Sequence, residues 1–387
     1  MVGLKILISA GEASGDLYAA GLAAELRRRH PDAELFGCAG PRMREAGVRA
    51  VVDAASLAVV GLIEVVGHIP RVWREYRKLL KAAREERPAL AILTDSPDFH
   101  LRLARHLKRM GIPVVYLVAP QVWAWRKGRL PAMRRSIDHL LCIFPFEEAF
   151  FRQHGVPVTY IGHPLSRLVR PTLSREAFFR KHGLAQDRPL VALLPGSRRD
   201  EAGRHMPALA EAAARIRQQL LVNLALGLPA GRFMASDFKE RIPGGAIQVI
   251  EGETWDLLAH STLALAASGT VTVEAALLGT PMVTFYKVTA LSWYAGKFLV
   301  DVPFYSMVNL IAGRAVVPEL MQNEMEGARL AAEALRLLND PAARAEMQRG
   351  LETVGRALAG PQDPMERAAD VVDEVLATNH VRQPSKD

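Results

Sequence analysis

The chain has 387 residues, of which half are hydrophobic and 23% are charged, with a net charge of +8. This balance is typical of globular domains and excludes a disordered chain, a collagen-like fibre and a small disulfide-rich scaffold. At roughly 150 residues per domain, the length predicts two domains or three. The positive charge favours an anionic partner, and the absence of any RNA- or DNA-binding motif argues against nucleic acid.

The amino terminus and the two cysteines indicate a cytoplasmic protein. Residues 1–10 have a very short apolar core followed by Glu12 and Asp16, so they predict a first strand rather than a signal peptide. No run of about 18 uncharged apolar residues predicts a membrane span. Cys38 and Cys142 are too sparse for a disulfide framework or a zinc site, which fits a reducing compartment.

Short apolar runs alternate with amphipathic stretches through the first half of the chain. A strand is expected at residues 5–9 and a helix at residues 16–30. Further strands are expected at residues 89–93, 113–118 and 140–144, with helical stretches between them, and another strand is expected to open at the Gly-Val-Pro of residues 155–157. Strands separated by helices predict βα units and a parallel sheet.

A connection rich in Pro and Arg at residues 163–188 interrupts the alternation, which then restarts. The second set of strands is expected at residues 190–194, 222–226, 247–250, 263–266 and 282–285. We therefore predict an α/β fold with two Rossmann-like domains, residues 1–165 and 166–363, facing a central cleft. By analogy with such folds, residues 364–387 form a helix that crosses back to the first domain.

The first βα turn has the sequence Gly-Glu-Ala-Ser-Gly-Asp at residues 11–16. Its glycines are four apart, so it is not the G-x-G-x-x-G fingerprint of NAD-binding proteins. One interpretation is a tight turn with a helix cap; the other is a hydroxyl or phosphate site for a second substrate. In the second case the binding residues are Glu12, Ser14, Gly15 and Asp16.

Residues 57–73 form an apolar stretch that runs into a cationic one. An apolar helix face followed by a basic face is typical of proteins that lie on an anionic bilayer, although a core helix followed by a solvated basic helix fits equally well. The candidate membrane residues are Leu62, Ile63, Val66, Ile69, Trp73, Arg74 and Arg77.

Two carboxylates follow the strand at residues 89–93, at the edge of the sheet where ligands collect. Asp95 and Asp98 lack the D-x-D spacing of a metal site, so they are candidates for a metal-free general base or, alternatively, a helix cap. Further along, an aromatic loop at residues 116–126 either lines an acceptor site or packs in the core. Its candidate acceptor-binding residues are Trp123, Trp125 and Arg126.

The second half carries two small-residue turns, each after a strand and before a helix, at residues 194–198 and 267–274. Such turns expose backbone N–H groups at a helix N-terminus, where phosphate binds. An arginine suits a diphosphate, and a glutamate one turn into a helix suits ribose hydroxyls. The alternative is two capped helix starts. The candidate residues are Gly196, Ser197, Arg198, Glu201, Ser268, Gly269, Thr270, Thr272 and Glu274.

With these motifs the chain resembles the lipid-A-disaccharide synthases, from about residue 5 to residue 376. It departs from the family pattern at residues 306–309, where Ser-Met-Val-Asn stands in place of Leu-Pro before Asn. The motifs that carry the resemblance lie in the family's order at residues 11–16, 95–99, 120–126, 161–164, 194–201, 268–274 and 309–322.

The resemblance implies an inverting, metal-independent GT-B glycosyltransferase without a cofactor. Its substrates are UDP-2,3-diacylglucosamine and 2,3-diacylglucosamine 1-phosphate (lipid X), and its products are the lipid A disaccharide 1-phosphate and UDP. It also implies peripheral attachment to the inner membrane of Gram-negative bacteria.

On this interpretation Asp98, or less favourably Asp95, is the base, and Asn309 belongs to the catalytic residues, positioning sugar hydroxyls or neighbouring loops together with Glu201. The alternatives are another UDP-sugar GT-B enzyme, such as the peptidoglycan N-acetylglucosaminyltransferase or a UDP-sugar epimerase, and a non-catalytic lipid-binding protein. The oligomeric state and the acyl-chain preference stay open.

Overall fold

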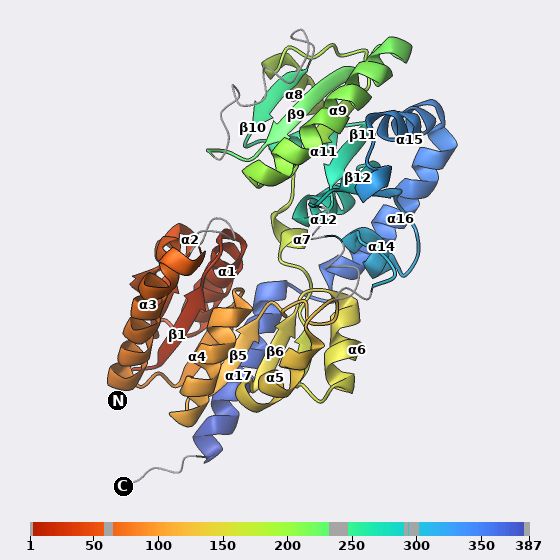
Figure 1. The fold of residues 1–387 in the computed structure, drawn as a ribbon. Coiled ribbons are helices and arrows are strands. Elements are labelled where there is room, and N and C mark those ends of the chain that lie inside the picture. The colour runs from red at the N-terminus through yellow and green to blue at the C-terminus, as the bar shows by residue number, and fades with distance from the viewer. Residues whose placement is uncertain (1–2, 58–64, 232–246, 290–292, 294–301, 383–387) are drawn as a thin grey trace. The chain divides into compact units, whose positions relative to one another are not determined.

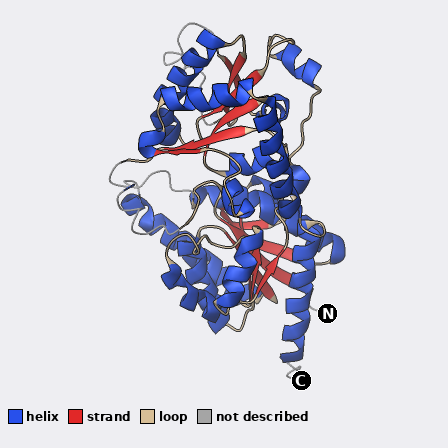
Figure 2. Ribbon diagram, turned by 90° about the vertical axis from the view of Figure 1, so that its right-hand side faces the viewer, coloured by secondary structure: helices blue, strands red, loops and turns tan. Residues whose placement is uncertain are grey.

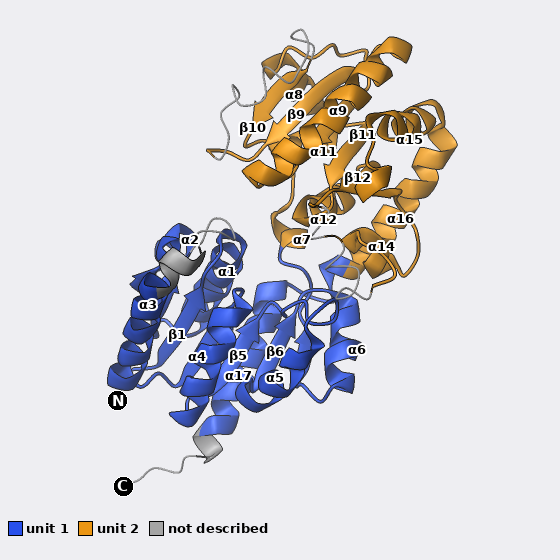
Figure 3. Cartoon of the chain, viewed as in Figure 1, with its two compact units in different colours: residues 1–164, 358–387 blue, residues 165–357 orange. Residues whose placement is uncertain are grey.

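The computed structural model describes residues 3–57, 65–231, 247–289, 293 and 302–382 (Figure 1). In each half of the chain, helices enclose a sheet of parallel strands (Figure 2). The chain divides into two compact units, residues 1–164 with 358–387 and residues 165–357 (Figure 3). Among the described residues, no helix is both long and apolar enough to cross a bilayer.

The first unit is built on a seven-stranded parallel sheet in the order β3-β2-β1-β4-β5-β6-β7. Its central strands are apolar on both faces, as expected for strands covered by helices on either side. The order reverses between β1 and β4, which places a switch point at their carboxyl ends. The strands are β1 (Lys5–Ala10), β2 (Glu34–Ala39), β3 (Arg49–Asp53), β4 (Leu90–Thr94), β5 (Val114–Leu117), β6 (His139–Cys142) and β7 (Val158–Tyr160).

Three helices of the first unit, α3, α4 and α5, pack side by side in one layer (Figure 1). Helix α1 packs against the carboxyl-terminal helix α17. The helices are α1 (Ala13–Arg29), α2 (Pro41–Glu45), α3 (Val65–Glu86), α4 (Pro97–Arg109), α5 (Leu130–Ser136), α6 (Pro145–Gln153) and α17 (Pro364–Arg382).

Helix α17 returns to the first unit, which confirms the predicted crossing. Arg29 of α1 bridges Asp370 and Asp373 at 2.8 and 3.0 Å, but such partly exposed ion pairs contribute about 1 kcal/mol at most. Val371 and Val372 are fully buried, and burying a valine side chain stabilises by roughly 1.5–3 kcal/mol. Apolar burial therefore contributes most of the stability of this contact, and the ion pairs help to orient the helix.

The second unit repeats the architecture with six parallel strands in the order β10-β9-β8-β11-β12-β13, and its switch point lies between β8 and β11. The strands are β8 (Leu190–Leu194), β9 (Asn223–Leu228), β10 (Gln248–Glu251), β11 (Leu263–Ala267), β12 (Met282–Tyr286) and β13 (Glu319–Met321). The helices are α7 (Leu165–Leu168), α8 (Arg175–Lys181), α9 (Arg199–Gln219), α11 (Thr254–His260), α12 (Thr270–Leu277), α14 (Met307–Ala312), α15 (Gly327–Asn339) and α16 (Pro341–Ala359).

The two parallel α/β sheets confirm the predicted fold class, but three strands were not expected from the sequence: β2, β3 and β13. β13 has only three residues, and β3, an edge strand, begins and ends with a charged residue. β2 contains a glycine and a cysteine, which weaken its strand pattern. Pairing with a neighbouring strand stabilises these strands in the sheet, which their own residue pattern does not reveal.

Candidate active site

Asp95 lies at the switch point of the first sheet, directly after β4. Its carboxylate accepts hydrogen bonds from the backbone N–H of Gly11 and of Glu12, both at 2.9 Å. These amides belong to the turn that follows β1, the strand next to β4. The sheet topology thus joins two of the predicted motifs, the glycine-containing turn and the first of the two candidate bases.

The glycines of this turn make room for the carboxylate. A Cβ atom on Gly15 would lie 1.7 Å from Asp95 Oδ2, far inside van der Waals contact. A Cβ on Gly11 would lie 2.7 Å from Ser96 Oγ and 3.2 Å from Asp95 Oδ1. The two glycines therefore leave the space that the side chains of Asp95 and Ser96 occupy, and their spacing requires no bound phosphate.

Burial raises the pKa of Asp95 to about 7. The two backbone N–H bonds stabilise the charged form and so lower the pKa, but burial has the larger effect. The charge of Glu12 raises it further. The side chain keeps an exposed fraction of 12%, so the carboxylate reaches the surface of the unit. A partly accessible carboxylate whose pKa is near neutrality is suited to accept a proton from a substrate hydroxyl.

Three buried polar side chains that the sequence analysis did not single out lie around Asp95. Ser9, His100 and Tyr116 are each fully buried, and His100 and Tyr116 both contact the Asp95 backbone carbonyl. One signal was present in the sequence, because Ser9 and Tyr116 interrupt apolar strands with hydroxyl groups. Nothing in the spacing connected them to Asp95.

Asp98, the second candidate base, lies on the surface in the first turn of α4. Its side chain is 74% exposed and is bridged by Arg126, at 3.1 Å, and by Arg129. The guanidinium of Arg126 also covers the ring of Trp125 at 4.3 Å, and Trp125 is itself exposed. The aromatic loop thus brings Trp125 and Arg126 beside the start of α4.

Trp123, the other candidate of this loop, points into the core. Its Nε1–H donates to Glu147 Oε1 at 2.9 Å, and both residues are buried. The pKa of Glu147 is raised to about 8 by burial. Of the two alternatives for the loop, Trp123 fits packing and Trp125 fits a surface contact.

The polar residues of the first βα turn separate in the same way. Asp16 is buried and accepts from the backbone N–H of Gly40 and Arg42, at 2.8 and 2.9 Å, and from that of Met43. It therefore holds the start of α2. Glu12 and Ser14 are exposed at the N-terminus of α1.

In the second unit, the two small-residue turns follow the neighbouring strands β8 and β11. Gly196 has a φ of +112°, and a Cβ there would lie 2.6 Å from the carboxylate of Glu201. Glu201 in turn accepts from the backbone N–H of Arg198 at 3.4 Å. Glu201 shapes the turn, while Ser197 and Arg198 are exposed at its tip.

The second turn presents Gly269 and Thr270, both exposed, at the N-terminus of α12. Two other candidate hydroxyls have partners within the protein: Ser268 donates to the Tyr305 carbonyl at 3.0 Å, and the buried Thr272 donates to the Gly269 carbonyl at 2.8 Å. This leaves the backbone at Gly269 and Thr270 as the part of the turn open to a ligand.

Glu274 lies one turn into α12 and is bonded to the side chain of Trp255 on α11. Burial raises the pKa of Glu274 to about 7, which the bond to Trp255 opposes. Its position fits a group that receives hydrogen bonds from hydroxyls in a partly dry site.

Asn309 is buried, and its side-chain amide is fully engaged in one loop. Nδ2 donates to the Val317 carbonyl and to Glu319, and Oδ1 accepts from the N–H of Val316 and Val317, at 2.7–3.0 Å. An asparagine side chain makes about four hydrogen bonds, so none is left for a substrate. The geometry fits the positioning of a loop, one of the two roles expected for it.

The candidate membrane residues fall in and before α3. Leu62 and Ile63 lie outside the described residues, and only the helical backbone is described at Val66 and Ile69. Trp73 is 48% exposed and stacks on Tyr76, with the guanidinium of Arg77 5.5 Å from its ring. Arg74 is exposed beside it.

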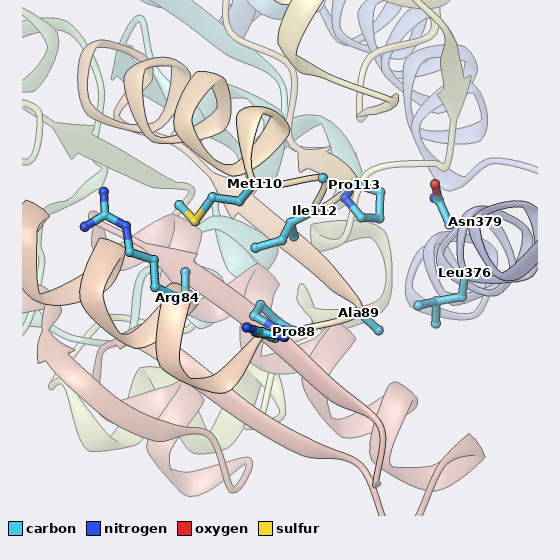
Figure 4. A pocket seen from close by; sticks show the side chains of 11 residues that line it. Arg84, Pro88, Ala89, Met110, Ile112, Pro113, Leu376 and Asn379 are labelled. Carbon is cyan, nitrogen blue, oxygen red and sulfur yellow. The ribbon is translucent and has the colours of Figure 1, made fainter. Parts of the chain in front are cut away.

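A cavity of about 630 Å³ lies at the other end of the first sheet. Pro88 and Ala89 precede β4, Ile112 and Pro113 precede β5, and together with Leu376 of α17 they line it (Figure 4). Ligands of open parallel sheets bind at the carboxyl ends of the strands, where Asp95 lies. This cavity is therefore not the candidate active site.

The chain matches the family model described as lipid-A-disaccharide synthetase over residues 6–363. It is 68% identical to the lipid-A-disaccharide synthase of Solibacter usitatus over 372 residues, which cover 96% of this chain and 97% of that protein. It is 41% identical to the enzyme of the same name from Myxococcus xanthus over 382 residues, covering 97% and 99%.

Solved structures with little sequence identity share the fold. A UDP-GlcNAc 2-epimerase from Neisseria meningitidis, bound to UDP-GlcNAc, has a TM-score of 0.64 at 12% identity and covers 97% of this chain and all of that one. The calicheamicin glycosyltransferase CalG4 has a TM-score of 0.61 at 18% identity and covers 97% and 99%. These matches confirm the GT-B architecture.

From the close approach of the Asp95 carboxylate to Gly15, we predict that Gly15→Ala destabilises the protein. Replacing a helical glycine by alanine ordinarily stabilises by roughly 0.5–1 kcal/mol, but here the new methyl group overlaps a carboxylate and costs roughly 1–3 kcal/mol. Gly21→Ala on the same helix is the matched control, because its Cβ meets only the flexible side chain of Met365. Urea unfolding of both variants tests this; equal stability of the two contradicts the packing.

Proposed function

The chain belongs to the lipid-A-disaccharide synthase family, and on that premise we propose that Asp95 is the general base of its reaction. The reaction transfers 2,3-diacylglucosamine from UDP to the 6-hydroxyl of 2,3-diacylglucosamine 1-phosphate. It yields the β-1,6-linked disaccharide 1-phosphate and UDP. The named relatives favour this reaction over the other UDP-sugar enzymes and over a non-catalytic lipid-binding protein.

In the proposed step, the acceptor hydroxyl loses its proton to Asp95 as its oxygen bonds to C1 of the donor sugar. The bond from C1 to the diphosphate breaks on the opposite side, UDP leaves with the bonding electrons, and the anomeric centre inverts. The observation that carries the assignment is the position of Asp95, which lies largely buried at the switch point with a pKa of about 7. General bases work best when their pKa lies near the operating pH.

The surroundings of Asp98 support a different role. Its lone pairs are directed at the guanidinium groups of Arg126 and Arg129, and the cluster is exposed next to Trp125. We propose that these arginines exchange Asp98 for the phosphate of the acceptor, with which an arginine forms paired hydrogen bonds. Glu12 and Ser14, exposed at the N-terminus of α1, complete the acceptor side.

For the donor, we propose that Arg198 and the N-terminus of α12 hold the diphosphate. Arg198 is exposed, and in the described part of the chain its guanidinium forms no ion pair with a carboxylate. The backbone at Gly269 and Thr270 adds the positive end of a helix dipole, which stabilises the charge of the leaving UDP. Glu274 receives the ribose hydroxyls.

We also propose that the layer of α3, α4 and α5 meets an anionic membrane surface. Trp73 offers an exposed ring of the kind found at membrane interfaces, flanked by arginines. A groove of about 550 Å³ between α4 and α5 adds four cations, Arg105, Lys108, Arg109 and Arg135, of which only Lys108 has a carboxylate partner among the described residues. Both substrates carry acyl chains and thus reside in membranes.

Asp95→Asn is expected to lower kcat by about 100-fold or more, because the amide cannot take the proton. Asp98→Asn is the matched control and keeps kcat within about threefold. An assay with radiolabelled UDP-2,3-diacylglucosamine and lipid X, in detergent with EDTA, measures kcat for both variants. A large loss in the Asp98 variant together with an active Asp95 variant contradicts the assignment.

Replacing Arg74 and Arg77 together by glutamate is expected to weaken binding to phosphatidylglycerol vesicles by at least 30-fold, since each basic residue near the surface contributes about 1 kcal/mol. The same change at Arg349 and Arg356 on α16 alters the net charge equally and is the control. Vesicle co-sedimentation at low salt measures the difference. If both pairs weaken binding to the same extent, α3 is not the membrane face.

A further inference from the structure

The peptide backbone at Asp95 has an unusual conformation. Asp95 and Ser96 have φ angles of +55° and +37°, in the left-handed region that side chains disfavour. Two such residues in succession persist only where the surrounding structure holds them. The direction of the Asp95 side chain depends on this backbone, because the Cα–Cβ bond turns with it.

Two buried side chains donate hydrogen bonds to the Asp95 carbonyl oxygen. The hydroxyl of Tyr116 on β5 lies 2.6 Å away, and Nδ1 of His100 on α4 lies 3.0 Å away. Neither residue contacts solvent. A carbonyl oxygen with two donors is fixed in direction, and the peptide that carries it is fixed as well.

These contacts also determine the tautomer of His100. A carbonyl oxygen only accepts, so the proton of the ring must be on Nδ1. Nε2 then accepts from the hydroxyl of Ser9, which lies 2.8 Å away on β1. Burial lowers the pKa of His100 to about 4, so the ring is neutral near pH 7. The hydrogen bond from His100 to the Asp95 carbonyl is therefore one between two neutral groups.

We propose that His100 and Tyr116 are positioning residues, which hold the left-handed Asp95 peptide so that its carboxylate faces the acceptor hydroxyl. The proposal rests on the assignment of Asp95 as the base. Together with Ser9, these two residues form a cluster that we call the clamp. Its three members come from three elements: Ser9 from β1, Tyr116 from β5 and His100 from α4. Neither His100 nor Tyr116 reaches the substrate, because both are enclosed in the core.

A purely structural role and a positioning role predict different kinetics. If the clamp only satisfies buried polar groups, its loss lowers stability and leaves kcat per folded molecule unchanged. If it positions the base, its loss lowers kcat by about 10- to 100-fold, the effect expected for a misplacement near 1 Å, while KM changes less than about twofold.

His100→Leu removes the donor at similar volume, and His100→Asn restores an N–H close to the position of Nδ1. Tyr116→Phe removes one hydroxyl and keeps the ring in the core, so it serves if the leucine variant fails to fold. We expect kcat to fall by about 10- to 100-fold in His100→Leu and Tyr116→Phe. In His100→Asn we expect kcat to stay within about threefold of the parent value. His139→Leu, a change at the amino end of β6, is the control for a lost polar contact.

Each variant is compared by kcat and KM, by thermal unfolding and by UDP binding, which reports on the intact second unit. An unchanged kcat in both His100→Leu and Tyr116→Phe overturns the positioning role, even where their unfolding temperatures fall. Equal losses in the asparagine and leucine variants also overturn it. Activity in Asp95→Asn instead overturns the assignment of the base, so the two failures are distinguishable.

Discussion

The turn after the first strand is built around one largely buried carboxylate, at the switch point of the sheet of the first unit. Asp95 lies against a turn that only glycine at positions 11 and 15 accommodates, and two backbone N–H groups of that turn direct it. Its burial lowers the stability of the folded protein at neutral pH. The pKa in the folded state, about 7, exceeds the ordinary value of about 3.9. Protonation of Asp95 therefore stabilises the folded protein most at low pH, and this contribution is lost as the pH rises to about 7. The same cost makes the carboxylate a proton acceptor at neutral pH.

The same pairing of a glycine with a carboxylate from another position shapes further turns. Gly40 leaves room for Asp16, and Gly196 leaves room for Glu201; in each case the carboxylate accepts backbone N–H groups. Two acids expected to contact substrates are thus used to build the turns that present other groups. In the first unit Asp16 holds the start of α2, and in the second Glu201 shapes the turn that presents Arg198.

Periodicity predicted the two parallel sheets, because their central strands are long, apolar and bounded by turn residues. It did not predict the short strand β13 or the edge strand β3, whose own residues carry only a weak strand pattern. The motifs at residues 11–16, 95–98, 194–201 and 268–274 were located from residue types alone. The sequence does not show which way a side chain points. Packing between elements far apart in the chain decides which of Asp95 and Asp98 is the more buried, and whether Trp123 points into the core.

The pH dependence of transfer tests the central assignment most directly. Because burial raises the pKa of Asp95 to about 7, the base is protonated below that pH, and kcat/KM for the donor at saturating acceptor is expected to fall tenfold per pH unit below about 7. At saturating acceptor the profile does not include the ionisation of the free acceptor's phosphate, near pH 6. A profile that stays flat from pH 8 to pH 5 contradicts Asp95 as the base.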